Sequence, residues 1–223
     1  MKYSEIVKFN KEFDNKKNLK KYRIFFLSNI VINSIEEVLE YLFLKNNLSL
    51  EINFSNYDNI IQESINLEKY DCIIVFWEFR NLIDGFNYSV ENISEDGFVK
   101  FKKKIIKDID YLFNNLKNCP LVLFNKFHNT YLENISNNIS KGQQFCNLIN
   151  DYLIKYRQPN LTLIDLNKVF ISVGIENCID ERFYYSHKSP YTFDFFIKYS
   201  DLAFQSIFTS LGKSKKAIIF DCD

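Results

Sequence analysis

The sequence predicts an α/β fold, a three-layer sandwich with a parallel central sheet and helices on both of its faces. Short apolar segments of strand length alternate along the chain with longer amphipathic segments of helical length. The strand segments are apolar on both sides, which is typical of strands that are covered by helices on both faces. Strands separated by helices of about 10 to 20 residues require right-handed crossover connections, and these produce a parallel sheet.

The first part of the chain reads as a β-α-β-α unit. Residues 20–27 (KKYRIFFL) pass from charged residues into a short apolar run that favours a strand. Ser34 and Glu37 then form a capping-box pattern, and the apolar residues after them fall on one helical face. A second strand over residues 48–54 and a second helical stripe over residues 57–67 complete the unit.

The second part of the chain continues the alternation. Residues 71–79 (DCIIVFWEF) are the most apolar run and predict a central strand, and the polar, turn-rich residues 81–96 predict a long loop. Later helices are expected over residues 97–117, 140–156 and 192–211, and strands over residues 121–125 and 161–165. In such sheets ligands bind beyond the carboxyl ends of the strands, so the residues just after each strand are the candidates for function.

Composition excludes several classes of function. The 223 residues are 47% hydrophobic and 25% charged, which is enough for a sizeable core. Lys plus Arg and Asp plus Glu both total 28, so no field attracts nucleic acid. The apolar runs are far shorter than the ~20 residues of a membrane span, and the N-terminus lacks a signal-peptide core, so we expect a cytoplasmic protein without membrane contact. Five scattered cysteines and two histidines favour neither disulfides nor a zinc site.

The C-terminal residues have the pattern of a new strand. Residues 212–215 read as a helix stop and linker, and residues 216–220 (KAIIF) read as a strand that ends in Asp221 and Asp223. Two carboxylates in this spacing are what phosphoryl transfer through an aspartyl phosphate requires, with Mg²⁺ neutralising the phosphate charge. The pair also arises by chance. We expect one domain over residues 1–213 and the first strand of an otherwise missing domain over residues 214–223.

KKAIIFDCD resembles the opening strand and first motif, Asp-x-Asp-x-Thr, of the haloacid dehalogenase (HAD) superfamily, in particular FkbH-like proteins of phosphatase subfamily IIIC. The segments FFLSNIVIN, NFSNYDNIIQESIN and LTLIDLNKVFISVGIENCIDERFYYSHKSPYT resemble the N-terminal half of these proteins. That half is similar to SGNH-type hydrolases, so the resemblance implies a flavodoxin-like central sheet. The likeness covers most of residues 20–223. It implies that Asp221 is a nucleophile and Asp223 an acid/base, with Mg²⁺ bound only in a complete HAD domain and no cofactor in this chain alone.

An SGNH-type site needs a serine after the first strand and a histidine oriented by an aspartate before the last helix. Ser28 lies at the expected turn, where it is either the nucleophile or a turn-stabilising hydroxyl. His187 follows Asp180 by seven residues, whereas SGNH hydrolases have Asp-x-x-His. His187 is therefore either the base or a solvated loop residue.

Four further residues are candidates for binding substrate. Asn29 either points its amide at an oxyanion or stabilises the turn, and Asn81 is the one residue that matches the Gly-x-Asn-Asp block of SGNH hydrolases. Arg182 and Lys188 either hold a carboxylate or phosphate or are surface charges.

For the intact protein, the resemblance implies transfer of an acyl unit, such as glyceryl, from a small acyl phosphate to the thiol of an acyl carrier protein. Two functions stay open for this chain. It is either a module that positions the carrier protein or substrate, or an active serine acyl-hydrolase or acyltransferase that uses Ser28, His187 and Asp180. The loose Asp-His spacing and the altered Gly-x-Asn-Asp block favour the module.

Overall fold

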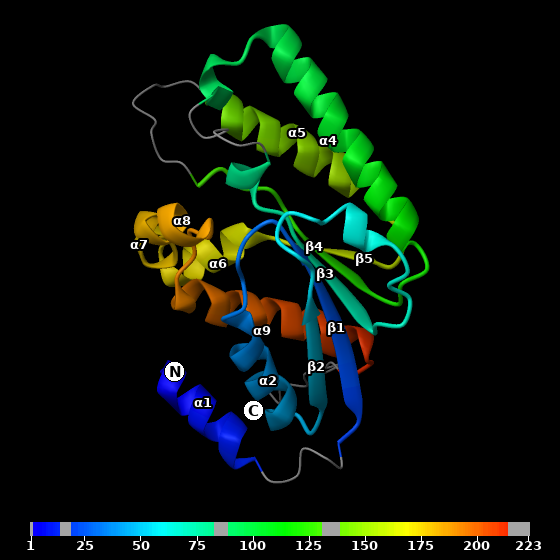
Figure 1. Ribbon diagram of the computed structural model, residues 1–223, viewed down its shortest axis with the longest axis vertical. Helices are drawn as coiled ribbons and strands as arrows, with labels where there is room; N and C mark the ends of the chain where they lie inside the picture. Colours follow the sequence, from blue (N-terminus) through cyan, green and yellow to red (C-terminus); the bar gives the residue numbers. More distant parts are fainter. Residues whose placement is uncertain (1, 14–18, 83–88, 131–138, 214–223) are drawn as a thin grey trace, which may run out of the picture.

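The computed structural model describes residues 2–13, 19–82, 89–130 and 139–213 (Figure 1). Its centre is a five-stranded sheet in the order β2-β1-β3-β4-β5, and every neighbouring pair is parallel. The strands are β1 (Lys21–Ser28), β2 (Ser49–Phe54), β3 (Cys72–Phe76), β4 (Val122–Asn125) and β5 (Leu161–Ile164). The predicted α/β class with a parallel sheet is therefore confirmed.

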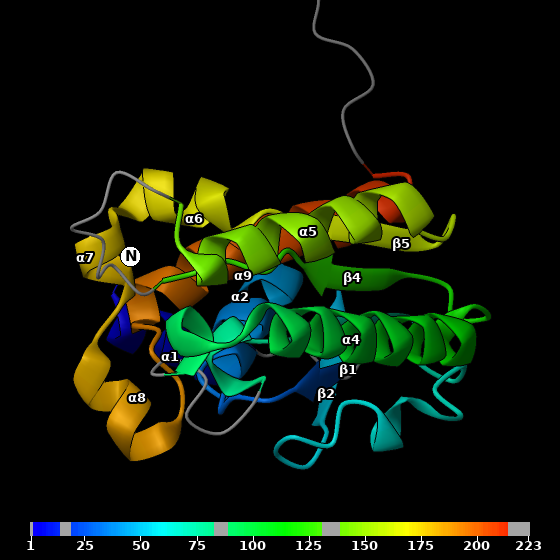
Figure 2. The same ribbon diagram turned by 90° about the horizontal axis from the view of Figure 1, so that it is seen from above.

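Helices cover both faces of the sheet (Figures 1 and 2). One face is covered by α2 (Ile35–Lys45), α6 (Leu166–Val173) and α9 (Phe193–Ser210), and the other by α4 (Glu95–Leu116) and α5 (Lys141–Tyr156). The two cores follow from the alternation of side chains along a strand. In β1, Ile24 and Phe26 join the first core, whereas Phe25 and Leu27 join the second.

An additional helix, α1 (Tyr3–Glu12), packs against α2 on the outside of the sandwich. Asn10 Nδ2 donates a hydrogen bond to the backbone oxygen of Glu37, 2.8 Å away. The short elements are α7 (Ile175–Cys178), α8 (Glu181–His187) and the 3₁₀ turns η2 (Gln62–Ser64), η3 (Phe79–Asn81) and η4 (Val90–Asn92).

The strands and the long helices agree with the sequence-based expectations, but the helix expected over residues 57–67 is wrong. Only η2 forms there. Asp58 and Asn66 have φ angles of 57° and 60°, in the left-handed region, which a right-handed helix cannot include. The apolar side chains that gave the helical spacing instead sit in successive turns, with Ile60 buried in the second core.

Two helix ends show how local chemistry sets the boundaries. α2 begins after Ser34 as expected, but the Ser34 side chain makes no capping bond. Turn bonds from Ile35 N to Ile32 O and from Glu36 N to Asn33 O lead into the helix instead. The unpredicted α6 has an ordinary cap, because the Asp165 carboxylate accepts from Asn167 N.

The strand order reverses between β1 and β3, which places the expected ligand crevice at their carboxyl ends. The chain segments that follow β1, β3 and β4 meet there with the segment that connects α7 to α9. An antiparallel bridge between Ile179 and Tyr191 holds the two ends of that segment together. In the described ranges, no helix combines the length and apolar character needed to cross a bilayer.

Candidate functional site

Two asparagine side chains extend the sheet beyond the end of β3. Asn29, just after β1, accepts from Glu78 N through Oδ1 at 2.6 Å and donates through Nδ2 to Glu78 O at 3.0 Å. Asn125, at the end of β4, pairs in the same way with the backbone of Trp77, at 2.8 and 3.3 Å. The backbones of β1 and β4 do not pair with residues 77 and 78, so the two side-chain amides satisfy the backbone N–H and C=O groups there instead. These bonds hold residues 77 and 78 in place.

We call these hydrogen bonds from Asn29 and Asn125 the clamp. It holds the backbone so that the Glu78 side chain lies in the interior, where it is 1% exposed. Tyr191 OH donates to Glu78 Oε2 at 2.5 Å, and Arg80 N donates to Oε1 at 3.2 Å. Burial raises the pKa of Glu78, while the hydrogen bond from Tyr191 and the charge of Arg80 oppose that shift. Burial and the neighbouring Glu78 also raise the pKa of Tyr191. The pair therefore links the segment after β3 to the segment before α9.

Arg80 is the centre of the same network and is also 1% exposed. Its Nε donates to Thr130 Oγ1 at 2.7 Å, and one terminal nitrogen donates to Thr130 O at 3.0 Å. The other terminal nitrogen donates to both carboxylate oxygens of Glu181, at 2.9 and 2.8 Å. The guanidinium also lies 5.4 Å from the ring centre of Tyr184. One buried cation therefore holds η3, the segment after β4, and α8 together.

The raised pKa of Glu78 predicts a pH dependence of stability. Between the ordinary value of 4.5 and the raised folded-state pKa, the native protein holds more protons than the unfolded chain, so this contribution to stability falls as pH rises through that window. Glu78→Gln cannot ionise and should lack this slope. Urea unfolding across a pH series measures it as the wild-type free energy of unfolding minus that of the variant. A difference that stays constant with pH would contradict the prediction.

Ser28 lies at the carboxyl end of β1, but its hydroxyl is engaged and 6% exposed. Its Oγ accepts from Ile30 N at 3.1 Å and donates to Ile30 O at 3.0 Å. Its backbone N–H donates to Ser55 Oγ at 3.2 Å. A small cavity of about 80 Å³ adjoins it. In this arrangement the serine stabilises the turn after β1.

The other predicted substrate and oxyanion groups also have partners within the protein. Asn81 Nδ2 donates to Asn29 O at 3.0 Å and to Lys188 O at 2.8 Å. These bonds bring together three of the sequence-predicted residues, but through the backbones of Asn29 and Lys188. The Asn29 side chain itself serves the clamp on Glu78.

The Asp180 carboxylate caps the N-terminus of α8. Its carboxylate accepts from Arg182 N at 3.0 Å and from the Arg182 guanidinium, with a shortest distance of 2.6 Å. Hydrogen bonds from Arg182 hold the pKa of Asp180 below its ordinary value. Lys188 ends α8 with a φ of 57° and is exposed. The His187 side chain, like Asp221 and Asp223, lies outside the described residues, so the roles expected for these three stay predictions.

The buried network of Glu78, Arg80 and Tyr191 was not among the sequence-predicted site residues. A signal for it exists, because Glu78 lies at the end of the apolar run over residues 71–79 and Arg80 follows it directly. Charged residues in such a run are buried only with partners, which predicts an ion network at that place. Its distant members, Thr130 and Glu181, follow no local pattern. Among the described residues, no group of three His, Cys, Asp or Glu side chains gathers to hold a metal ion.

The fold has relatives among solved structures. The N-terminal part of protein BF1531 from Bacteroides fragilis, described as containing a phosphatase domain complexed with Mg, superposes with a TM-score of 0.76 at 14% identity. The alignment covers 97% of this chain and 58% of that one. The chain therefore spans little more than half of that neighbour.

A lipase, Lip_vut3 from a goat rumen metagenome, superposes with a TM-score of 0.58 at 10% identity, over 84% of this chain and 97% of that one. This chain shares the fold of both proteins. The α/β sandwich expected from the sequence is therefore a fold that solved structures also contain. No protein-family model matches the sequence, and no curated protein matches it.

Proposed function

We propose that this chain is the SGNH-like module of an FkbH-like acyl transferase and phosphatase, and that it positions a carrier protein or substrate rather than cleaving an acyl bond itself. The observation that carries the proposal is the engagement of the reactive groups. The Ser28 hydroxyl, the Ser28 N–H, the Asn81 amide and the Asp180 carboxylate each bond to another part of the chain. An acyl-transfer site needs such groups directed at the substrate.

The likeness to a protein described as containing a phosphatase domain supports the FkbH-like part of the proposal.

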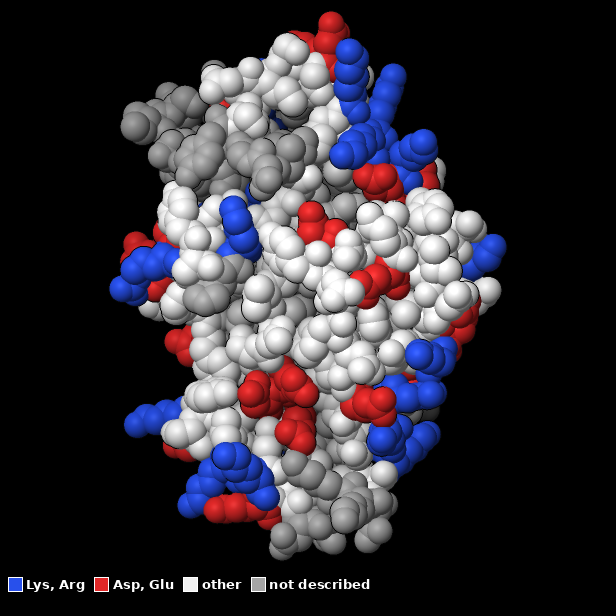
Figure 3. Space-filling view, viewed as in Figure 1, with Lys and Arg blue, Asp and Glu red and all other residues white. Residues whose placement is uncertain are grey.

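Charge is unevenly distributed on the neutral chain, which supports a macromolecular partner. Figure 3 shows positive side chains along α4 and negative ones over α2. The exposed lysines of α4 lie on one helical face at the spacing i, i+3, i+4 and i+7: Lys100, Lys103, Lys104 and Lys107. Such a stripe favours a partner with a negatively charged face and affects mainly the rate of association.

The docking part of the proposal is tested by retention on an immobilised acyl carrier protein. We expect the chain to be retained at low ionic strength and the double variant Lys103→Glu and Lys104→Glu to be retained less, with the difference shrinking as salt is added. Lys155→Glu, an exposed lysine on α5, is the matched control and should behave like the wild type. Failure of the wild-type chain to bind at any salt concentration would count against the module.

The alternative is an active serine hydrolase, and the position of Ser28 at the end of β1 beside a small cavity favours it. Under the proposed function, a fluorophosphonate probe should leave Ser28 unlabelled, and p-nitrophenyl acetate hydrolysis should be equal for the wild type and Ser28→Ala. Mass spectrometry of the probe-treated chain locates any label. Labelling that disappears in Ser28→Ala would overturn the proposal and establish the alternative.

A further inference from the structure

A second cavity lies beside the Ser28 turn and has the character of a ligand site. It measures about 300 Å³ and lies between the turn that precedes α2 and the connection from α8 to α9. Val31 and Asn33 line both this cavity and the small one next to Ser28, so the two adjoin. Its size is at the lower end of the ~300–1,000 Å³ that is usual for small-molecule sites.

The walls of this cavity are mostly apolar, with aromatic rings from α8 and α9 and a few uncharged polar side chains. Tyr191 and Phe196 are both buried at 3% exposure, while Val31 and Phe183 stand at the surface with more than 40% exposure. Within the described parts of the chain, no charged side chain lines it. The nearby cations have other contacts, since Arg182 bonds to Asp180 and the Lys188 amine lies 5.7 Å from the ring centre of Tyr184. Neither residue lines the cavity. A phosphate or carboxylate would enter this cavity without a counter-charge.

One polar group in the wall lacks a partner. Ser189 lines the cavity and is 5% exposed, and its hydroxyl is enclosed without a hydrogen-bond partner among the described residues. An unpaired buried hydroxyl costs free energy, and an incoming hydrogen-bond acceptor removes that cost. Rotation about the χ1 bond is the only heavy-atom movement that a serine side chain needs to redirect Oγ.

We propose that this cavity binds a neutral carbonyl compound with a short apolar chain, such as a thioester or amide, whose carbonyl oxygen accepts a hydrogen bond from Ser189 Oγ. The apolar chain packs between Phe183 and Phe196. The choice of an acyl thioester among neutral carbonyl compounds rests on the proposed function. The cavity and its unpaired hydroxyl are observed independently of that function. We expect a phosphorylated acyl compound not to bind here, because no charged side chain is among the described residues that line the cavity.

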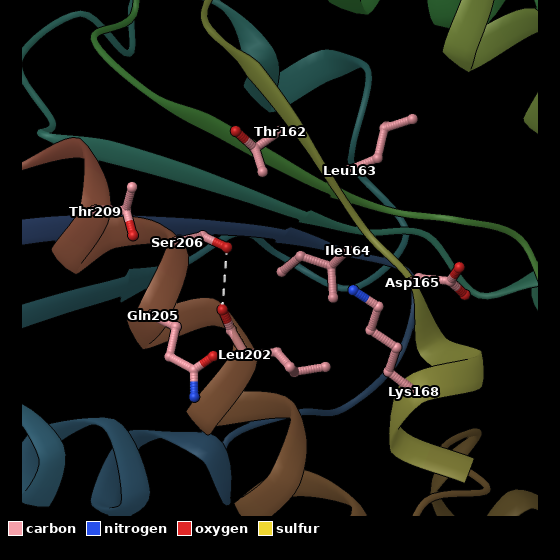
Figure 4. Close-up of a pocket in the computed structure, with 9 residues that line it drawn as sticks. All are labelled: Thr162, Leu163, Ile164, Asp165, Lys168, Leu202, Gln205, Ser206 and Thr209. Carbon is pink, nitrogen blue, oxygen red and sulfur yellow. Dashed lines mark hydrogen bonds between the residues drawn. The ribbon is translucent and has the colours of Figure 1, made fainter. Parts of the chain in front are cut away.

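The experiment titrates the full chain with S-butanoyl-N-acetylcysteamine and measures the dissociation constant by calorimetry. Ser189→Ala should weaken binding by about 3- to 10-fold, as loss of one neutral hydrogen bond implies. Val31→Trp, at the exposed rim, should abolish binding by filling the mouth. Ser206→Ala is the matched serine control and should bind like the wild type, because Ser206 lines a different pocket, between α9 and β5 (Figure 4). The anionic probe 3-phosphoglycerate should not compete.

Thermal unfolding of the same variants separates a binding role from a structural one. Ser189→Ala should melt at the same or a higher temperature than the wild type, because it removes a buried hydroxyl without a partner. Thioester binding that survives both Ser189→Ala and Val31→Trp, no thioester binding at all, or competition by 3-phosphoglycerate would overturn the inference. If the carrier protein is retained but the thioester does not bind, the cavity inference fails and the proposed function stands. If the thioester binds but the carrier protein is not retained, the cavity inference stands and the docking role is refuted.

Discussion

Replacing Arg80 by leucine is expected to lower the free energy of unfolding by about 2–4 kcal/mol, because it leaves two buried oxygens of Thr130 without their donor. The Glu181 carboxylate contributes less to this loss, since its side chain is 51% exposed and can turn to water. The side chain is 1% exposed and donates to Glu181 and to both Thr130 Oγ1 and Thr130 O. Its loss also leaves the buried carboxyl of Glu78 without the charge that opposes its raised pKa. Urea unfolding followed by circular dichroism measures the change.

Arg182→Leu is the matched control for this prediction. Arg182 also pairs with a carboxylate at 2.6 Å, but its side chain is 88% exposed. Exposed ion pairs contribute little, so we expect a change of less than about 1 kcal/mol. Equal effects of the two substitutions would show that the network around Arg80 does not stabilise the fold.

Asn29→Ala is expected to cost about 2–4 kcal/mol, because it leaves two buried backbone groups of Glu78 without a partner at once. Asn29 is fully buried, so water does not readily replace the lost amide. The same urea titration measures the loss. The substitution should also increase hydrogen exchange at the amide of Glu78, which distinguishes the clamp from a general packing defect.

Asn33→Ala serves as the control for Asn29→Ala. Asn33 lies in the same turn but is exposed, so its replacement should change stability by less than about 0.5 kcal/mol. If Asn29→Ala lowers the free energy of unfolding as little as Asn33→Ala does, the clamp is not needed to hold residues 77 and 78.

The sheet was predictable because its signals are local. Runs such as residues 71–79 are too short and too apolar for anything but a buried strand, and α4, α5 and α9 follow amphipathic patterns of three turns or more. The stretch over residues 57–67 failed because helical spacing does not reveal that Asp58 and Asn66 adopt positive φ angles. α8 was missed because a helix of seven residues carries little periodicity, although Asp180 is a good N-cap.

The candidate site was less predictable, since its bonds join residues that are far apart in the sequence. The position of Ser28 after β1 follows from the strand pattern, but the bonds of its hydroxyl with Ile30 depend on how the turn closes. The contact of Tyr191 with Glu78 spans 113 positions, and that of Glu181 with Arg80 spans 101. A single sequence gives the residue types for such contacts but not the pairing.

The bridge between Ile179 and Tyr191 allows the segment between them, which contains α8, to vary in length. Asp180 N donates to Pro190 O at 2.8 Å, and Thr192 N donates to Cys178 O at 2.9 Å. The two ends of the segment that contains α8 are therefore bonded to each other. Lengthening a loop whose ends are already pinned adds only a slowly growing entropy of closure. Insertions there can reshape the rim of the crevice while the sheet beneath keeps its register.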